Sequence, residues 1–134
     1  MNEKLKEWIQ NGITDEAVDW ANKFGEKLAS RDNANRLNPM TTAQLRKFFG
    51  EIRRIDADLN SKLDDLPMLK PMLAYAVGRD RDGGVHRTKI GVFEKEITAG
   101  IDVVLKSSDK KSSFKNFLKL VEAIVAYHKF HGGK

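Results

Sequence analysis

The sequence contains no cysteine among its 134 residues. Disulfide bonds, thiolate zinc sites and a cysteine nucleophile are therefore excluded, and this absence suits a reducing cytoplasm. Long apolar runs are missing too. No stretch approaches the roughly 20 apolar residues of a membrane span, and the charged start MNEKLKEWIQ lacks the apolar segment of a secretory signal. We expect a soluble cytoplasmic protein with no membrane partner.

Proline is scarce, with three residues in the chain, and no long run alternates apolar and polar residues between hairpin turns. Apolar residues recur three and four positions apart instead, as they do in amphipathic helices. A chain of this length can bury one continuous core without disulfide bonds or metals. The sequence therefore predicts an all-α fold: a compact single-domain bundle of about five helices over residues 1–134.

Capping residues and turn signals set the expected helix boundaries in the first half of the chain. A short apolar turn, residues 5–9, stops at the Asn-Gly pair 11–12. Thr14 is a plausible N-cap for the next helix, and the polar residues 31–39 form a loop. Thr41 or Thr42 then caps a third helix. Its apolar positions are Leu45, Phe48, Phe49, Ile52, Ile55 and Leu59.

The stretch DDLPMLKPMLAYAVGR predicts a short, strongly apolar helix. Asp65 is able to cap this helix, and both Pro67 and Pro71 are tolerable near a helix start. Because the segment is so apolar, we expect it to be buried. Tyr75 could stack on a nucleobase, but its place in this helix favours the core.

A loop and two longer helices complete the expected fold. The loop is assigned to residues 78–84, and the helices to residues 86–106 and 112–131. The last helix places His128 on its apolar face, partly buried, and the glycines that follow His131 accept the positive φ of a helix end.

Positive charge is unevenly distributed along the chain. The formal net charge is +5, with a net of −1 over residues 1–39 and +6 over residues 40–134. Such an excess raises the rate of encounter with polyanions, but it also keeps an ordinary protein soluble. Charge alone therefore makes nucleic acid only one of several possible partners.

Four of the basic residues fall on one arc of the third helix. At about 100° per residue, Arg46, Lys47, Arg53 and Arg54 lie together, opposite the apolar positions. Gly50 lies within the arc and costs the helix about 0.8 to 1.0 kcal/mol relative to alanine, a cost that close approach of another backbone would explain. Glu51 is the one acid bordering the arc, so we expect these charges not to be spent mainly on local ion pairs. A solvated face is an equally good interpretation.

A second basic region surrounds two adjacent glycines. It comprises Arg79, Arg81, His86, Arg87 and Lys89. Flexible basic loops can follow a phosphate backbone through arginine side chains and main-chain amides. Asp80 and Asp82 partly cancel this charge, and an ordinary exposed loop fits the pattern equally well.

Catalytic signatures are scarce. His128 and His131 are spaced to share a metal, but no carboxylate or cysteine stands near enough in sequence to complete a site. The Asp-x-Asp of RDRDGG lacks the remaining ligands of a calcium loop, and the chain has no Walker loop and no nucleophile elbow. We expect no enzyme activity, no cofactor and no metal site.

Two stretches resemble a known family. Residues 41–79, TTAQLRKFFGEIRRI to LKPMLAYAVGR, and residues 114–133, FKNFLKLVEAIVAYHKFHGG, resemble the small subunit of the type III-A CRISPR interference complex. This resemblance implies a compact, helical, non-catalytic protein whose copies form an inner filament beside the repeated backbone subunits. It also implies a basic surface that contacts guide and target RNA in antiviral defence, while the backbone and large subunits carry the catalysis.

The resemblance also assigns residues to the RNA contact. Arg46, Lys47, Arg53 and Arg54 lie in the matching motif, so we expect them to contact phosphates. Arg79 closes the second motif and is added. Lys70, in the Leu-Lys-Pro position, is a weaker candidate because it could pair with Asp64 or Asp65. Recognition is expected to be independent of sequence, since pairing with the guide already reads the target.

Two other functions remain open from the residues. In the first, the protein is a helical scaffold whose basic faces meet acidic patches on neighbouring subunits and never touch RNA. In the second, it is a small nuclease that uses His128 or Asp80. Assembly defects without RNA defects would indicate the scaffold, and cleavage would indicate the nuclease.

Overall fold

Apolar residues three and four positions apart give most helices of this chain one buried side. The computed structural model describes residues 3–82 and 87–134. Its elements are α1 (Glu3–Asn11), α2 (Asp15–Ala29), α3 (Thr42–Ala57), α4 (Leu59–Lys62), the 3₁₀ helix η1 (Leu63–Met68), α5 (Leu69–Arg81), α6 (Ile90–Lys106) and α7 (Lys110–Phe130). Within the described ranges the chain forms no strand, and the predicted all-α fold is confirmed.

The expected caps are present at the starts of α2 and α3. The Thr14 hydroxyl accepts a hydrogen bond from the amide of Ala17 at 3.2 Å. Thr41, the first of the two threonines considered, caps α3 through a reciprocal pair of bonds with Gln44. Six helices of nine residues or more are present in the described part of the chain, one more than the number expected.

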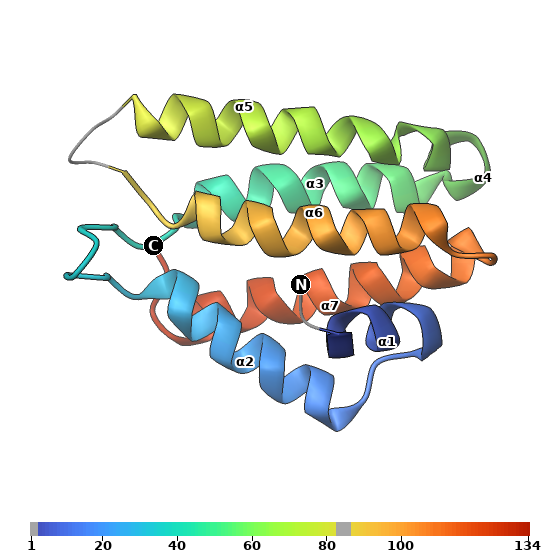
Figure 1. Cartoon of the computed structure of the whole chain (residues 1–134), viewed down its shortest axis with the longest axis horizontal. Helices are drawn as coiled ribbons and strands as arrows, with labels where there is room; N and C mark the ends of the chain where they lie inside the picture. Colours follow the sequence, from blue (N-terminus) through green and yellow to red (C-terminus); the bar gives the residue numbers. More distant parts are fainter. Residues whose placement is uncertain (1–2, 83–86) are drawn as a thin grey trace.

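Helix α7 is the centre of the packing. It lies against α1, α2, α3 and α6 (Figure 1) and buries Phe114, Phe117, Val121 and Ile124 completely. Polar contacts fix its register. The Asn116 side-chain amide donates to the carbonyl of Ile9 at 2.9 Å, and Lys115 pairs with Asp56 of α3 at 2.5 Å.

The closest helix crossing joins α2 to α7. A Cβ atom at Gly25 would lie 2.8 Å from the main-chain nitrogen of His128 and 2.8 Å from Cβ of Tyr127. Two carbon atoms in van der Waals contact need about 3.5 to 4.0 Å. Gly25 therefore allows α2 to pack directly on the main chain of α7.

Helix α5 differs from the helix expected in this region. It begins at Leu69 with no side-chain cap, so Asp65 does not cap it and lies in η1 instead. It continues to Arg81, so residues 78–81 are helical and not part of a loop, while residues 83 and 84 lie outside the described ranges. Figure 1 shows α5 along one edge of the molecule, on the side away from α2.

The expected burial of α5 is also wrong. Only Leu69 and Leu73 are buried, and the Tyr75 side chain is 71% exposed. Helix α5 packs on α6, η1 and α3 and does not lie in the centre of the bundle, so the side turned away from them meets solvent.

The last two helices start at different positions from those expected. Helix α6 starts at Ile90 and not at residue 86, which is outside the described residues, and α7 spans Lys110–Phe130. His128 is fully buried, and its Nε2 lies 2.6 Å from the carbonyl oxygen of Met40. The chain reverses at Gly132, whose φ of 89° confirms the expected glycine at this helix end.

The length and apolarity of a helix decide whether it can span a membrane. Among the described residues, no helix is both long enough and apolar enough to cross a bilayer.

The glycines on α2 and α3 give a matched pair of stability tests. We expect Gly25→Ala to lower the free energy of unfolding by about 2 kcal/mol, because the new methyl group meets main-chain atoms that cannot rotate away. Gly50 has no atom within 4 Å of the corresponding position. Gly50→Ala should therefore raise stability by about 0.8 to 1.0 kcal/mol through helix propensity alone.

Thermal unfolding followed by circular dichroism measures both changes. The midpoint of Gly50→Ala should rise by about 3 to 5 °C, and that of Gly25→Ala should fall. Equal midpoints for the two variants would show that α2 does not pack on the α7 main chain as described.

Candidate nucleic-acid interface

The four cations predicted on one arc are all exposed on α3. Arg46 and Lys47 occupy the first turns of the helix, and Arg53 and Arg54 lie two turns further along. The structure also divides the arc. Lys47 and Arg54 border α5 and η1, whereas Arg46 and Arg53 lie on the outward side of α3. Of these four side chains, Arg46, Lys47 and Arg53 form no ion pair within the described residues.

Arg53 packs on an aromatic ring. Its guanidinium carbon lies 5.6 Å from the centroid of the half-buried Phe49 ring. A cation over an aromatic face gains about 0.5 to 1 kcal/mol at an exposed site and keeps its charge. Arg53 is therefore held in place but still available to an anion.

Arg54 does not fit the expectation of free charge. Its Nε donates to Glu51 at 3.0 Å, and its Nη1 lies 3.4 Å from a carboxylate oxygen of Asp65 in η1. Hydrogen bonding to Glu51 raises the pKa of Arg54, desolvation opposes this rise, and the hydrogen bond to Asp65 adds to it. Arg54 is therefore the exception among the four cations: Glu51 pairs with it from within α3, and η1 brings a second acid to the arc.

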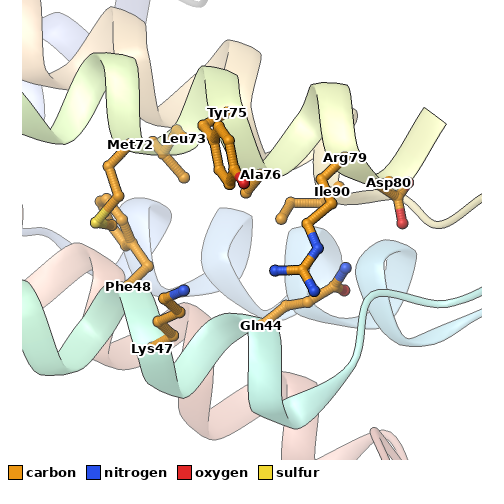
Figure 2. Close-up of a pocket in the computed structure, with 10 residues that line it drawn as sticks. All are labelled: Gln44, Lys47, Phe48, Met72, Leu73, Tyr75, Ala76, Arg79, Asp80 and Ile90. Atoms are coloured by element: carbon orange, nitrogen blue, oxygen red, sulfur yellow. The ribbon is translucent and has the colours of Figure 1, made fainter. Parts of the chain in front are cut away.

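A groove runs between α3 and α5. Figure 2 shows Lys47 of α3 and Arg79 of α5 reaching into the same gap, with Tyr75 hanging from α5 beside them. The cavity has a volume of about 490 Å³. Its apolar lining consists of Phe48, Met72, Leu73, Ala76 and Ile90. The groove therefore combines an apolar surface with two cations from different helices.

A small polar network closes one end of the groove. The Asp80 carboxylate accepts from the Thr88 amide at 2.8 Å and from the Thr88 hydroxyl at 3.0 Å. The same hydroxyl accepts from the side-chain amide of Gln44 at 3.1 Å. These bonds join the end of α5, the start of α6 and the capping box of α3. They fix the spacing of the two groove walls.

Lys70 lies apart from the other candidates. Its Nζ is 2.7 Å from a carboxylate oxygen of Asp102 on α6, so neither of the expected partners, Asp64 and Asp65, holds it. Lys70 does not line the groove. The structure thus brings Lys47 and Arg79 together and leaves Lys70 on the side of α5 that meets α6.

The second basic region is only partly available to a ligand. Lys89 is buried, and its Nζ donates to the carbonyl of Lys27 at 2.6 Å, at the end of α2. Burial lowers the pKa of Lys89, opposed by the charge of Asp32. Arg81 and Arg87 are exposed, whereas His86 falls outside the described ranges. Lys89 therefore has a structural role, which sequence spacing alone did not reveal.

The two histidines have separate structural partners. His128 lies against Met40 as described above. The Nε2 of His131 is 2.6 Å from the side-chain oxygen of Asn22, and its Nδ1 is 3.3 Å from Glu26. No group of three His, Cys, Asp or Glu side chains suited to a metal occurs within residues 3–82 and 87–134.

The sequence interpretation placed Tyr75 in the core, and the structure exposes it. Met72, Tyr75 and Arg79 recur at helical intervals on α5, with Met68 at the end of η1 one turn before them, but this spacing does not indicate which side of the helix the fold leaves exposed. Met68 and Tyr75 are strongly exposed. A helix with one exposed apolar stripe was interpreted as a helix buried all round.

Comparison with known proteins connects this chain to one family. The family model described as Csm2 Type III-A matches residues 14–134. A curated Streptococcus thermophilus protein named "CRISPR system Cms protein Csm2" is 29% identical over 128 residues, which cover 91% of this chain and 97% of that protein. No solved structure matches the chain significantly.

Two threonines provide a test of the network behind the groove. Thr88→Val should lower the free energy of unfolding by about 1 to 3 kcal/mol, because Gln44 and Asp80 each lose a partner. Thr98 is the control, since its hydroxyl is buried with no hydrogen-bond partner in the described part of the chain. Thr98→Val should keep or raise the free energy of unfolding, because it removes a buried hydroxyl that has no hydrogen-bond partner among the described residues.

Urea unfolding of the two variants and the parent chain gives the comparison. A Thr88→Val variant as stable as Thr98→Val would show that the network does not fix the groove walls.

Proposed function

This chain belongs to the type III-A Csm2 family, and we propose that, as a small subunit of a type III-A CRISPR effector complex, it contacts guide and target RNA through the basic surface of α3 and α5. The family assignment agrees with the resemblance of residues 41–79 and 114–133. The family assignment does not depend on the RNA contacts, which we infer from the placement of the charges.

One observation carries the proposal. Arg46, Lys47, Arg53 and Arg79 are exposed, and none of them forms an ion pair within the described ranges, although 19 acidic residues are present in the chain. Cations that a protein leaves unpaired on one surface are available to neutralise phosphates. Arg54 belongs to the same surface, with its charge partly compensated by Glu51 and Asp65. Lys70 remains a secondary candidate, because RNA would have to compete with Asp102.

Contacts of this type do not read sequence. Arginine and lysine at phosphates position a nucleic acid, whereas specificity requires contacts with base edges. A subunit that follows RNA already selected by guide pairing needs only the first kind of contact. The same surface therefore serves any guide and target.

The wider assembly is part of the proposal. Copies of this subunit line up as an inner filament beside the backbone and large subunits, in the cytoplasm, in antiviral defence. The exposed outward side of α3 faces the RNA in this arrangement, and other surfaces of the bundle meet the neighbouring subunits.

We assign the subunit no catalytic role. The groups considered for a nuclease are occupied: His128 is buried against Met40, and both oxygens of Asp80 accept hydrogen bonds from Thr88. A general acid or base must come within hydrogen-bond reach of the substrate. His128 cannot do so without unfolding the end of α7.

Charge reversal on α3 tests the RNA contact. The double variant Arg46→Glu and Arg53→Glu should bind single-stranded RNA more weakly, and by a similar factor for unrelated sequences, because the contacts carry charge and not base identity. The slope of log affinity against log salt should become shallower by about 0.7 for each lost contact. Fluorescence anisotropy over a series of salt concentrations measures both quantities.

The matched control reverses two cations on other helices. Lys6 and Lys23 are exposed on α1 and α2, so Lys6→Glu with Lys23→Glu makes the same change in net charge. The control should keep most of the affinity and the parent slope. Equal losses in the two double variants would refute a localised RNA surface. Unchanged RNA binding combined with failure to co-purify with the other subunits would indicate the scaffold function.

Incubation with RNA tests the absence of catalysis. Purified protein with Mg²⁺ or Mn²⁺ should leave labelled single-stranded RNA intact on a denaturing gel, since His128 is buried and both oxygens of Asp80 are held by Thr88. Cleavage that persists through purification and disappears in an Asp80→Asn variant would contradict this expectation.

A further inference from the structure

Tyr75 is an exposed aromatic residue with no structural function in the described chain. Its side chain is 71% exposed at the wall of the α3–α5 groove, and its hydroxyl group makes no hydrogen bond with the residues that the structure describes. The ring lies beside the groove and not on the outer side of α5 (Figure 2). An aromatic ring placed in this way is ready to stack on a planar ligand.

The groove around Tyr75 combines the two surfaces that a nucleotide requires. Its lining is mainly apolar, with Met72 of α5 and Phe48 of α3 meeting at one end, while Lys47 and Arg79 approach from opposite walls. A nucleobase is an apolar, planar group with phosphates on either side of its sugar. Proteins that bind single strands combine such aromatic platforms with a positively charged groove.

We propose that this groove accepts one unpaired nucleobase of the bound RNA, stacked on Tyr75, while the flanking phosphates contact Lys47 and Arg79. The inference rests on the proposed RNA contact and deepens it. It makes the groove a binding site for single-stranded RNA, whereas Arg46 and Arg53 on the outward side of α3 contact phosphates alone.

The charges in and beside the groove favour RNA over a protein helix as the occupant. Lys47 and Arg79 have no acidic partner in the described ranges, and the nearby Asp80 carboxylate is held by Thr88. An apolar helix from another protein would have to desolvate both cations without compensating their charge, which is unfavourable. Phosphates compensate both charges.

The polar groups at the closed end indicate that the site does not distinguish bases. Gln44 is the one amide side chain that lines the groove in the described structure, and it already bonds to Thr88 and to the Thr41 amide. It has little capacity left to read a base edge. Stacking alone is tolerant of sequence, because every base has an aromatic face.

Variants at Tyr75 test the inference in the full-length protein. Tyr75→Ala should weaken binding of a short single-stranded RNA about 5- to 150-fold, the range expected for one lost stacking contact. Tyr75→Phe should keep the parent affinity, because the ring and not the hydroxyl makes the contact. The slope of log affinity against log salt should be the same for the parent chain and both variants, since no charge is removed.

Phe130→Ala provides the matched control. Phe130 is 76% exposed at the end of α7 and does not line the groove. Its removal should leave RNA affinity unchanged. Duplex RNA of the same length is the second control, and the Tyr75→Ala effect should disappear with it because paired bases cannot enter the groove.

A fluorescent base gives a direct readout of stacking. A single-stranded RNA that carries one 2-aminopurine should lose fluorescence when it binds the parent chain or Tyr75→Phe, and it should lose less with Tyr75→Ala. Thermal unfolding of each variant confirms that the fold is retained.

The outcomes separate this inference from the proposed function. If the parent chain binds RNA and Tyr75→Ala binds it equally well, the base site is refuted and the phosphate contacts on α3 stand. If the parent chain binds no RNA, the base site and the proposed RNA contact are both refuted. If Tyr75→Ala retains RNA binding but no longer co-purifies with the other subunits, the groove binds protein and the base site is again refuted.

Discussion

The packing of α7 is the constraint on which the remaining structure depends. Its apolar residues are buried by α1, α2, α3 and α6, and these helices are placed by their contacts with it. Helix α5 is different because it rests on α6, η1 and α3. A helix at this distance from the centre is covered on one side only. The groove beside α3 and the exposed ring of Tyr75 both follow from that position.

Local signals in the sequence predicted most of the helices. Thr14 and Thr41 are good caps whatever the tertiary structure, because the hydroxyl satisfies an amide of its own helix. Apolar periodicity likewise predicted the buried sides of α3 and α7. Prediction failed at α5, since its apolar residues surround the helix and nothing in the local pattern indicates which side the other helices leave exposed.

The sequence predicted which charged residues of the candidate site are exposed, but it did not predict their ion-pair partners. The exposure of Arg46, Lys47, Arg53 and Arg54 follows from helical geometry. Their different environments do not, because Asp65 reaches Arg54 only through the turn that η1 makes. Lys70 and Lys89 show the same limit. Their partners, Asp102 and the carbonyl of Lys27, are 32 and 62 positions away in the chain.

The packing order also affects how the chain folds during synthesis. Helices α1 and α2 are translated well before α7, although both pack against it. Until residues 110–130 have left the ribosome, the apolar surface that α1 and α2 bury against α7 stays uncovered. Nascent chains in this condition are prone to aggregate and are substrates for chaperones. The core of the bundle is therefore complete only after α7 has joined the other helices.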